Sequence, residues 1–162
     1  MIAAPIASFN AMNVKQTILL VDDSENDLFL MRAAFKKAEF HSPLHAVQNG
    51  EEAIAYLKGE GIYSDRDQYA LPAVMLLDLN MPRKNGFQVL EWVRAQPELK
   101  RLSVIILTAS LRTEDVERAF DLGANAFLVK PATLDYLITM IRWLRDWLEI
   151  NHFPPLNEVV RR

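Results

Sequence analysis

Short apolar runs alternate with longer amphipathic segments along the chain. The runs cover residues 17–21, 74–77, 104–107 and 126–129, and a polar residue follows each of them directly. Runs this short, apolar at nearly every position, are typical of strands that are buried on both faces of a parallel sheet. Residues 44–47 are a weaker candidate for one more strand.

Between these runs, apolar residues recur near the 3.6-residue period of an α-helix. The segment 26–40 shows this period, with Ser24 as a candidate N-cap. Further helices are predicted over residues 51–57, 87–94, 114–122 and 134–150. Gly123 stands where a helix C-cap belongs, and residues 59–71 form a longer polar connection that we expect to be an exposed loop. The alternation of five strands with five helices predicts a doubly wound α/β fold with right-handed crossovers.

The length of 162 residues favours a single domain, which we assign to residues 16–150. Residues 1–13 carry no charge and lack the features of a signal peptide, so we expect residues 1–15 to form a disordered leader. Met12 is an alternative start of translation, just before the first strand. Residues 151–162 are expected to form a C-terminal tail.

The composition excludes several classes of protein. The chain has no cysteine, which rules out disulfides, thiolate metal sites and a cysteine nucleophile, and fits a cytoplasmic location. The net charge of −3 and the lack of a basic block argue against a nucleic-acid partner. No apolar run approaches the roughly 20 residues that span a bilayer, so no membrane segment is expected.

The polar residues that follow the apolar runs form a chemically distinctive set. Asp22 and Asp23 follow the first run, Asp78 the second, Thr108 the third and Lys130 the fourth. In open α/β sheets, ligands bind outside the carboxyl ends of the strands. The fold therefore brings three carboxylates, one hydroxyl and one ammonium to a single edge of the sheet.

Carboxylates that lie close together repel one another, and a hard divalent cation relieves that repulsion. Mg²⁺ prefers few carboxylates, several waters and a phosphate oxygen. We expect Asp23 and Asp78 to be direct ligands, with the backbone carbonyl of Asn80 as a third. Asp22 is expected to act through water.

The same residues suit phosphoryl transfer to a carboxylate, with Asp78 as the nucleophile. The transition state of such a transfer is loose, so catalysis is mainly positioning and charge neutralisation. Lys130 can pair with Asp78 at rest and with a phosphoryl oxygen after transfer. Thr108 can donate a hydrogen bond to the same group.

The sequence around these residues resembles that of the response-regulator receiver family. The motifs that carry the resemblance occur in family order: Val-Asp-Asp at 21–23, Leu-Asp-Leu-Asn-Met-Pro at 77–82 with Gly86, Leu-Thr-Ala at 107–109, and Val-Lys-Pro at 129–131. They cover roughly residues 16–149. The resemblance implies a flavodoxin-like sheet with strand order 2-1-3-4-5.

The resemblance also implies a role for each site residue. The phosphoacceptor maps onto Asp78, the switch hydroxyl onto Thr108, the lysine onto Lys130 and the switch aromatic onto Phe127. The peptide bond before Pro131 is usually cis in the family, so we expect a cis bond here.

A receiver of this kind is a phosphoacceptor switch with slow self-dephosphorylation, and not an enzyme in the ordinary sense. Its expected partners are a histidine kinase or a histidine phosphotransfer protein and a downstream protein. Asn80 and Ser110 flank the expected water path and would tune the phosphoryl lifetime. Within the family, the chain is similar to single-domain regulators of the phytochrome-associated type.

Other functions fit the pattern less well. A phosphatase of the haloacid-dehalogenase type also uses an aspartyl nucleophile, but it needs a second Asp two residues later, where this chain has Asn80. A phosphorylation-independent adaptor that binds through the last helix stays open. Taken alone, paired acids such as Asp22 and Asp23 often mark no more than a turn.

The last predicted helix carries two apolar stripes. One should pack on the sheet, and the other consists of Tyr136, Met140, Trp143, Trp147 and Ile150. The second stripe is either extra core covered by residues 153–156 or a partner surface, because exposed aromatic patches usually mark interfaces. We favour an interface, most simply that of a symmetric homodimer.

Overall fold

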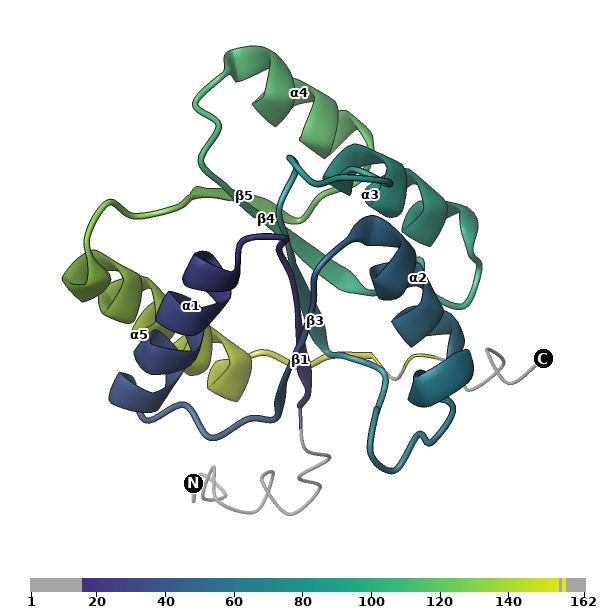
Figure 1. The fold of residues 1–162 in the computed structure, drawn as a ribbon, viewed down its shortest axis with the longest axis horizontal. Coiled ribbons are helices and arrows are strands. Elements are labelled where there is room, and N and C mark those ends of the chain that lie inside the picture. Colours follow the sequence, from purple (N-terminus) through teal and green to yellow (C-terminus); the bar gives the residue numbers. More distant parts are fainter. Residues whose placement is uncertain (1–15, 155, 157–162) are drawn as a thin grey trace, which may run out of the picture.

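The protein folds around a five-stranded parallel sheet in the order β2-β1-β3-β4-β5 (Figure 1). The computed structural model describes residues 16–154 and 156, so the expected leader at residues 1–15 and most of the end of the tail lie outside the described part. The strands are β1 (Ile18–Val21), β2 (Leu44–Val47), β3 (Val74–Leu77), β4 (Ser103–Thr108) and β5 (Ala126–Val129). The predicted doubly wound fold and its strand order are confirmed.

Helices cover both faces of the sheet. They are α1 (Glu25–Lys37), α2 (Gly50–Lys58), α3 (Gly86–Ala95), α4 (Thr113–Asp121) and α5 (Leu134–Ile150). Helices α1 and α5 share one hydrophobic core with the sheet, and α2, α3 and α4 share the other (Figure 1). This arrangement explains why the central strands read as continuous apolar runs: both of their faces are buried.

Strand β1 shows how successive side chains divide between the two cores. Leu19 and Val21 belong to the core beneath α2 and α3, whereas Ile18 and Leu20 belong to the core beneath α1 and α5. All four side chains are at most 2% exposed. The edge strand β2 is less buried, which is why its residues form a weaker strand pattern.

Side-chain caps fix where α1, α2, α3 and α5 begin. The Ser24 hydroxyl accepts a hydrogen bond from the Asp27 amide, as the sequence predicted for the start of α1. Asn85 and Gln88 form a capping box at the start of α3. After α4, Gly123 adopts a φ of 98°, a left-handed conformation that favours glycine, so the predicted stop is confirmed.

The connection over residues 59–71 is a largely exposed loop, as the sequence predicted, but part of it packs against the core. It contains a 3-10 helix, η3 (Gly61–Tyr63), and the side chains of Tyr63 and Tyr69 pack against the core. The Arg66 guanidinium donates hydrogen bonds to the carbonyl oxygens of Tyr56, Leu57 and Tyr69. The sequence did not predict these contacts, which hold the tyrosines and the arginine of the loop against α2 and the core.

One further expectation concerns the peptide bond before Pro131. Among the described residues there is no cis peptide bond, so the cis bond expected before Pro131 is absent and that expectation was wrong. The trans form is also the lower in free energy for an ordinary X-Pro bond, by about 0.5–1 kcal/mol.

Within the described residues, no helix has the length and apolar character that crossing a membrane requires.

The segment after α5 runs from one core toward the other (Figure 1). The Phe153 ring meets Trp147 edge-on at 5.4 Å between centroids, and Leu156 packs against the core on the opposite face of the sheet. The chain after α5 therefore joins both cores.

Candidate functional site

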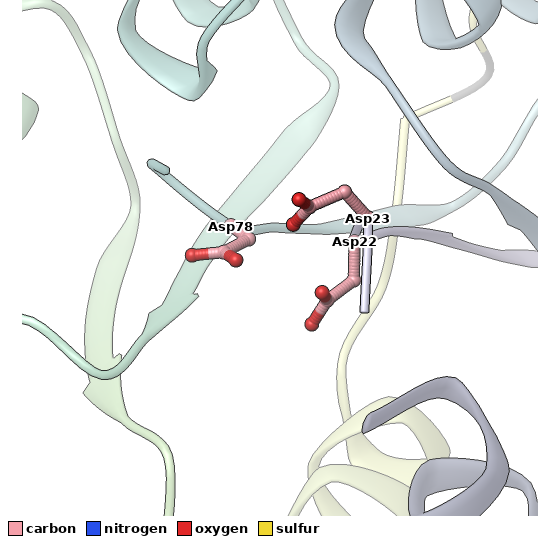
Figure 2. A group of neighbouring side chains, drawn as sticks. All are labelled: Asp22, Asp23 and Asp78. Carbon is pink, nitrogen blue, oxygen red and sulfur yellow. The ribbon is translucent and has the colours of Figure 1, made fainter. Parts of the chain in front are cut away.

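Three carboxylates converge at the carboxyl edge of the sheet (Figure 2). Val21 of β1 is in register with Leu77 of β3, so the residues that follow these strands are neighbours. One carboxylate oxygen from each of Asp22, Asp23 and Asp78 lies within 4.8 Å of the others. Asp22 and Asp78 are buried, whereas Asp23 is exposed, so the group opens to solvent on one side.

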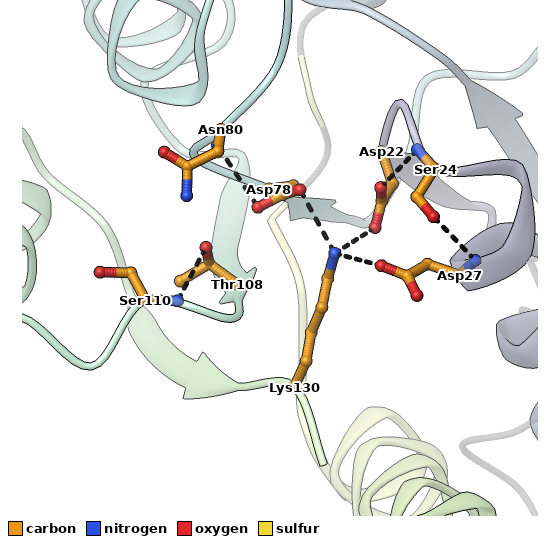
Figure 3. A network of polar contacts seen from close by, with 8 residues as sticks. All are labelled: Asp22, Ser24, Asp27, Asp78, Asn80, Thr108, Ser110 and Lys130. Atoms are coloured by element: carbon orange, nitrogen blue, oxygen red, sulfur yellow. Dashed lines mark hydrogen bonds and ion pairs between the residues drawn. The ribbon is translucent and has the colours of Figure 1, made fainter. Parts of the chain in front are cut away.

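The Lys130 ammonium lies beside this acidic group (Figure 3). Its Nζ is 2.6 Å from Asp22 Oδ2, 2.8 Å from Asp27 Oδ2 and 3.3 Å from Asp78 Oδ2. The Lys130 side chain is only 18% exposed. The cation therefore neutralises part of the negative charge that the fold concentrates here.

Burial and charge act in opposite directions on these groups. Burial raises the pKa of the Asp22 carboxyl, and hydrogen bonds from Lys130 and from the Ser24 amide offset part of that rise. Burial by itself lowers the pKa of Lys130, but the hydrogen bonds to Asp22 and Asp27 and the charge of Asp78 outweigh it and raise the pKa overall. Lys130 is thus a fixed cation at neutral pH.

Both oxygens of Asp22 have partners. Asp22 Oδ1 accepts a hydrogen bond from the Ser24 amide at 2.9 Å, and Oδ2 pairs with Lys130. Asp23 has no such pairing with Lys130 and points into the same group in Figure 2. This difference is consistent with Asp22 acting on a metal through water and Asp23 acting directly.

The loop after β3 folds closely over Asp78. Asp78 Oδ1 accepts a hydrogen bond from the Asn80 amide at 3.4 Å. The Gly86 amide donates to the Leu79 carbonyl at 3.0 Å, and a Cβ at Gly86 would lie 2.8 Å from the Leu79 Cα. The absence of a side chain at Gly86 lets the start of α3 approach Asp78.

Thr108 and Ser110 lie at the end of the next strand (Figure 3). The Thr108 side chain is fully buried, and its hydroxyl accepts a hydrogen bond from the Ser110 amide at 3.4 Å. The Ser110 hydroxyl donates to the Asp115 carboxylate. Side-chain hydrogen bonds therefore hold the connection between β4 and α4 in this conformation.

Phe127 lies on the edge strand β5, where it pairs in register with Ile106 of β4. Its side chain is half-buried and packs against the core beneath α3 and α4. It does not belong to the acidic group itself. Its assignment as the switch aromatic stays a prediction from the family resemblance.

Asp27 is the residue of this site that the sequence analysis missed. It follows no strand and sits in the first turn of α1, where an acidic residue is ordinary because of the helix dipole. Its position four residues after Asp23 was the available signal. One helical turn carries a carboxylate at this position back toward the strand end.

The expected interface residues lie away from the acidic group, on α5. Tyr136 is 70% exposed and Trp143 is 48% exposed, whereas Met140 and Trp147 are half-buried. The rings of Trp143 and Trp147 stack at 6.0 Å. An open apolar groove of about 470 Å³ runs between β5 and α5, and its lining includes Tyr136, Met140 and Trp143.

The chemistry of the donors fits a hard divalent cation. Three carboxylates supply oxygen ligands, which Mg²⁺ and related ions prefer, and one face of the group is open to water. The described residues have no cysteine that would favour a softer metal.

Comparison with known proteins agrees with this geometry. The response regulator receiver domain family matches residues 18–142. Response regulator Rcp1 of Synechocystis is 34% identical over 143 residues, which are 88% of this chain and 95% of that protein. The crystal structure of the phosphorylated cyanobacterial phytochrome response regulator RcpA has a TM-score of 0.80 at 31% identity and covers 88% of this chain and 100% of that chain. The Mn²⁺-bound form of Rcp1 has a TM-score of 0.76 at 34% identity, and the match covers 86% of this chain and 99% of that chain. The chain belongs to the response-regulator receiver family of two-component signalling.

Proposed function

We propose that this receiver takes a phosphoryl group on Asp78. A carboxylate oxygen of Asp78 forms a bond to phosphorus while the bond between phosphorus and the donor breaks. The observation that supports this role is the contact of Asp78 with the Lys130 ammonium at 3.3 Å, beside the carboxylates of Asp22 and Asp23. Receiver domains are phosphoacceptor switches and not classical enzymes.

Mg²⁺ is the cofactor that we propose for this site. Receiver domains bind a divalent metal at such an acidic group, and the related regulator Rcp1 has a crystal structure in a Mn²⁺-bound form. Asp23, Asp78 and the backbone carbonyl of Asn80 would hold the ion, and Asp22 would hold one of its waters. The ion supplies positive charge that offsets the charge of the transferring group.

Lys130 and Thr108 would bind the transferred group. The Lys130 ammonium donates to a phosphoryl oxygen, and the Thr108 hydroxyl moves toward the same group. Phe127 follows inward into the space that Thr108 leaves, and the surface around β4, β5 and their helices changes. This is a shift between two conformations that already exist in equilibrium.

The aspartyl phosphate would hydrolyse slowly without a separate phosphatase. Asn80 is exposed beside Asp78, and Ser110 follows Thr108 at the end of the neighbouring strand (Figure 3). We propose that these two side chains tune the phosphoryl lifetime.

The phosphodonor would be a histidine kinase or a histidine phosphotransfer protein, and a downstream protein would read the switch. The related RcpA is a phytochrome response regulator, so a phytochrome-type sensor kinase is the first donor to test. A cytoplasmic location suits such a kinase. We propose no nucleic-acid or membrane partner for the chain.

The second apolar stripe of α5 would form a homodimer interface. Tyr136 and Trp143 are exposed beside an apolar groove, which supports this use. The Trp147 ring contacts Phe153 of the tail, whereas Tyr136, Trp143 and Ile150 are exposed. The tail therefore covers the stripe at Trp147 and leaves these three residues open. A self-complementary use of this patch would give a symmetric dimer.

The deciding experiment measures intact mass after incubation with Mg²⁺ and acetyl phosphate. The parent protein should gain one phosphoryl group, and the Asp78→Asn variant should gain none, because an amide is not a nucleophile of this kind. Omitting Mg²⁺ should abolish the gain in the parent. If the parent protein gains no mass, the phosphoacceptor function is wrong and the chain acts as a phosphorylation-independent adaptor.

A further inference from the structure

Asp27 contacts the Lys130 ammonium from a helix that the proposed mechanism does not use. Its Oδ2 is 2.8 Å from Lys130 Nζ, although the two residues are 103 positions apart in sequence. The Asp27 side chain is 34% exposed and that of Lys130 is 18% exposed, so water competes only partly for this contact. Figure 3 shows Asp27 and Asp78 on opposite sides of the ammonium.

Asp27 is itself held in place by the start of α1. Its backbone amide donates to the Ser24 hydroxyl, and the Ser24 amide donates to Asp22 Oδ1. Ser24 therefore fixes the spacing between Asp22 and Asp27. These two carboxylates also make the two shortest contacts with Lys130, at 2.6 and 2.8 Å.

The Lys130 ammonium has three N–H donors and no acceptor. Asp22, Asp27 and Asp78 supply one carboxylate each, and Asp78 makes the longest contact at 3.3 Å. When Asp78 becomes an acyl phosphate, its carboxyl group loses its charge, and the phosphoryl oxygens become the stronger acceptors beside it. With two N–H groups held by Asp22 and Asp27, the third already points toward the place where those oxygens arrive.

We propose that Asp27 is a positioning residue for phosphoryl transfer: it holds one N–H of the Lys130 ammonium so that another is directed at the phosphoryl group on Asp78. The proposal rests on the proposed function of Asp78 as phosphoacceptor. It gives the first turn of α1 a part in the reaction, since a displacement of that turn would redirect the ammonium.

Two simpler roles for Asp27 make different predictions. If Asp27 only adds negative charge to the site, then Asp27→Ala and Asp27→Asn should behave alike, because both remove the charge. If Asp27 only stabilises α1 through the helix dipole, then Glu25→Ala should have the same effect, because Glu25 lies in the same first turn. Positioning requires an acceptor at this place, and the Asn amide oxygen provides one.

The first measurement is the rate of phosphorylation by acetyl phosphate at saturating Mg²⁺, followed by intact mass. We expect Asp27→Ala to lower the limiting rate about tenfold, the usual effect of losing one orienting hydrogen bond. Asp27→Asn should recover most of the rate, and Glu25→Ala should match the parent protein. Equal rates for the Ala and Asn variants would overturn the proposal, as would an Asp27→Ala rate equal to that of the parent.

The second measurement does not depend on phosphorylation. Proton-nitrogen NMR of the Lys130 ammonium reports how fast its protons exchange with water. Exchange should be slow in the parent, fast in Asp27→Ala and intermediate in Asp27→Asn, in samples whose melting shows that they are folded. If the parent accepts phosphoryl and the variants do not change the exchange, the positioning role alone is overturned. If the variants change the exchange but the parent accepts no phosphoryl, the proposed function is overturned, and the positioning role in the reaction falls with it.

Discussion

At the scale of single residues, Gly86 sets how closely α3 can approach the acidic group. An added Cβ would overlap the Asp78 carbonyl oxygen and lie 2.8 Å from the Leu79 Cα, and both belong to backbone that cannot turn aside. Gly86 does not have a positive φ, so the Gly86→Ala variant suffers only this overlap. We expect the free energy of unfolding in urea to fall by about 1–3 kcal/mol. The rate of phosphorylation by acetyl phosphate should fall as well, because Asp78 is displaced.

The matched control for that variant is Gly61→Ala. A Cβ at Gly61 meets no atom within 4 Å, but its φ is 59°. The free energy of unfolding of the control should therefore fall by about 1 kcal/mol, because alanine is strained in the left-handed conformation. Its phosphorylation rate should equal that of the parent protein. An unchanged rate in Gly86→Ala would show that the loop over Asp78 adjusts without moving the carboxylate.

The residues of the site differ in how far the sequence could predict them. Asp22, Asp78 and Lys130 could be found because each directly follows an apolar strand, and strand ends share one edge of a parallel sheet. Asp27 was missed because its spacing from Asp23 is only a weak signal, and its contact with Lys130 depends on how α1 packs on the sheet beside α5. That Lys130 pairs more closely with Asp22 than with Asp78 is likewise a tertiary detail that the sequence pattern does not provide.

At the scale of elements, Arg94 ties the end of α3 to the amino edge of the sheet. Its guanidinium donates to the carbonyl oxygens of Gly123 and Leu102 and to the side chain of Asn125. Burial lowers the pKa of Arg94. We expect Arg94→Met to lower the free energy of unfolding in urea by about 2–3 kcal/mol, because buried carbonyls lose a charged donor. Phosphorylation should persist in the folded variant, since this contact lies at the edge opposite the acidic group.

Arg94→Lys is the informative comparison. It keeps the charge, but an ammonium cannot reproduce the planar fork of donors that reaches several carbonyls at once. Its stability should therefore stay nearer to that of Arg94→Met than to that of the parent protein. A lysine variant as stable as the parent would show that charge alone matters at this position.

The elements themselves were well predicted where local signals agree. The bounds of α5 and of β2, β3 and β5 match the predicted ranges, because apolar periodicity and polar ends coincide there. The contacts within the connection over residues 59–71 were not predicted, for a physical reason. Its order comes from Tyr63, Tyr69 and Arg66 contacting α2, and such contacts leave no periodic trace in the sequence.

At the scale of the whole molecule, two hydrophobic cores sit on either side of one sheet. Alternation of strands with helices was enough to predict the layers, but the strand order needed the family resemblance. Which face of α5 is covered could be only half predicted. The first stripe packs on the sheet as expected, while the second divides between the contact of Trp147 with Phe153 and open surface at Tyr136 and Trp143.

The proposed homodimer is best tested at the exposed residues of the second stripe. Trp147 packs against the core, so its replacement would disturb the fold, whereas Tyr136 and Trp143 can be replaced with little structural cost. In sedimentation, the parent protein should show twice the 18.5 kDa mass of one chain, and Tyr136→Ala/Trp143→Ala should show the single mass. Central aromatic residues contribute about 2 kcal/mol or more each to an interface, so losing both weakens association by a factor of several hundred or more.

Phe29→Ala provides the control for that experiment. Phe29 is 69% exposed on α1, so it matches the exposure and aromatic character of the replaced residues but lies on another helix. Its variant should sediment like the parent protein. A single-chain mass for the parent, measured with and without acetyl phosphate and Mg²⁺, would exclude the homodimer and leave the groove beside α5 to a different protein. A dimer that persists in Tyr136→Ala/Trp143→Ala but not in Phe29→Ala would move the interface to α1.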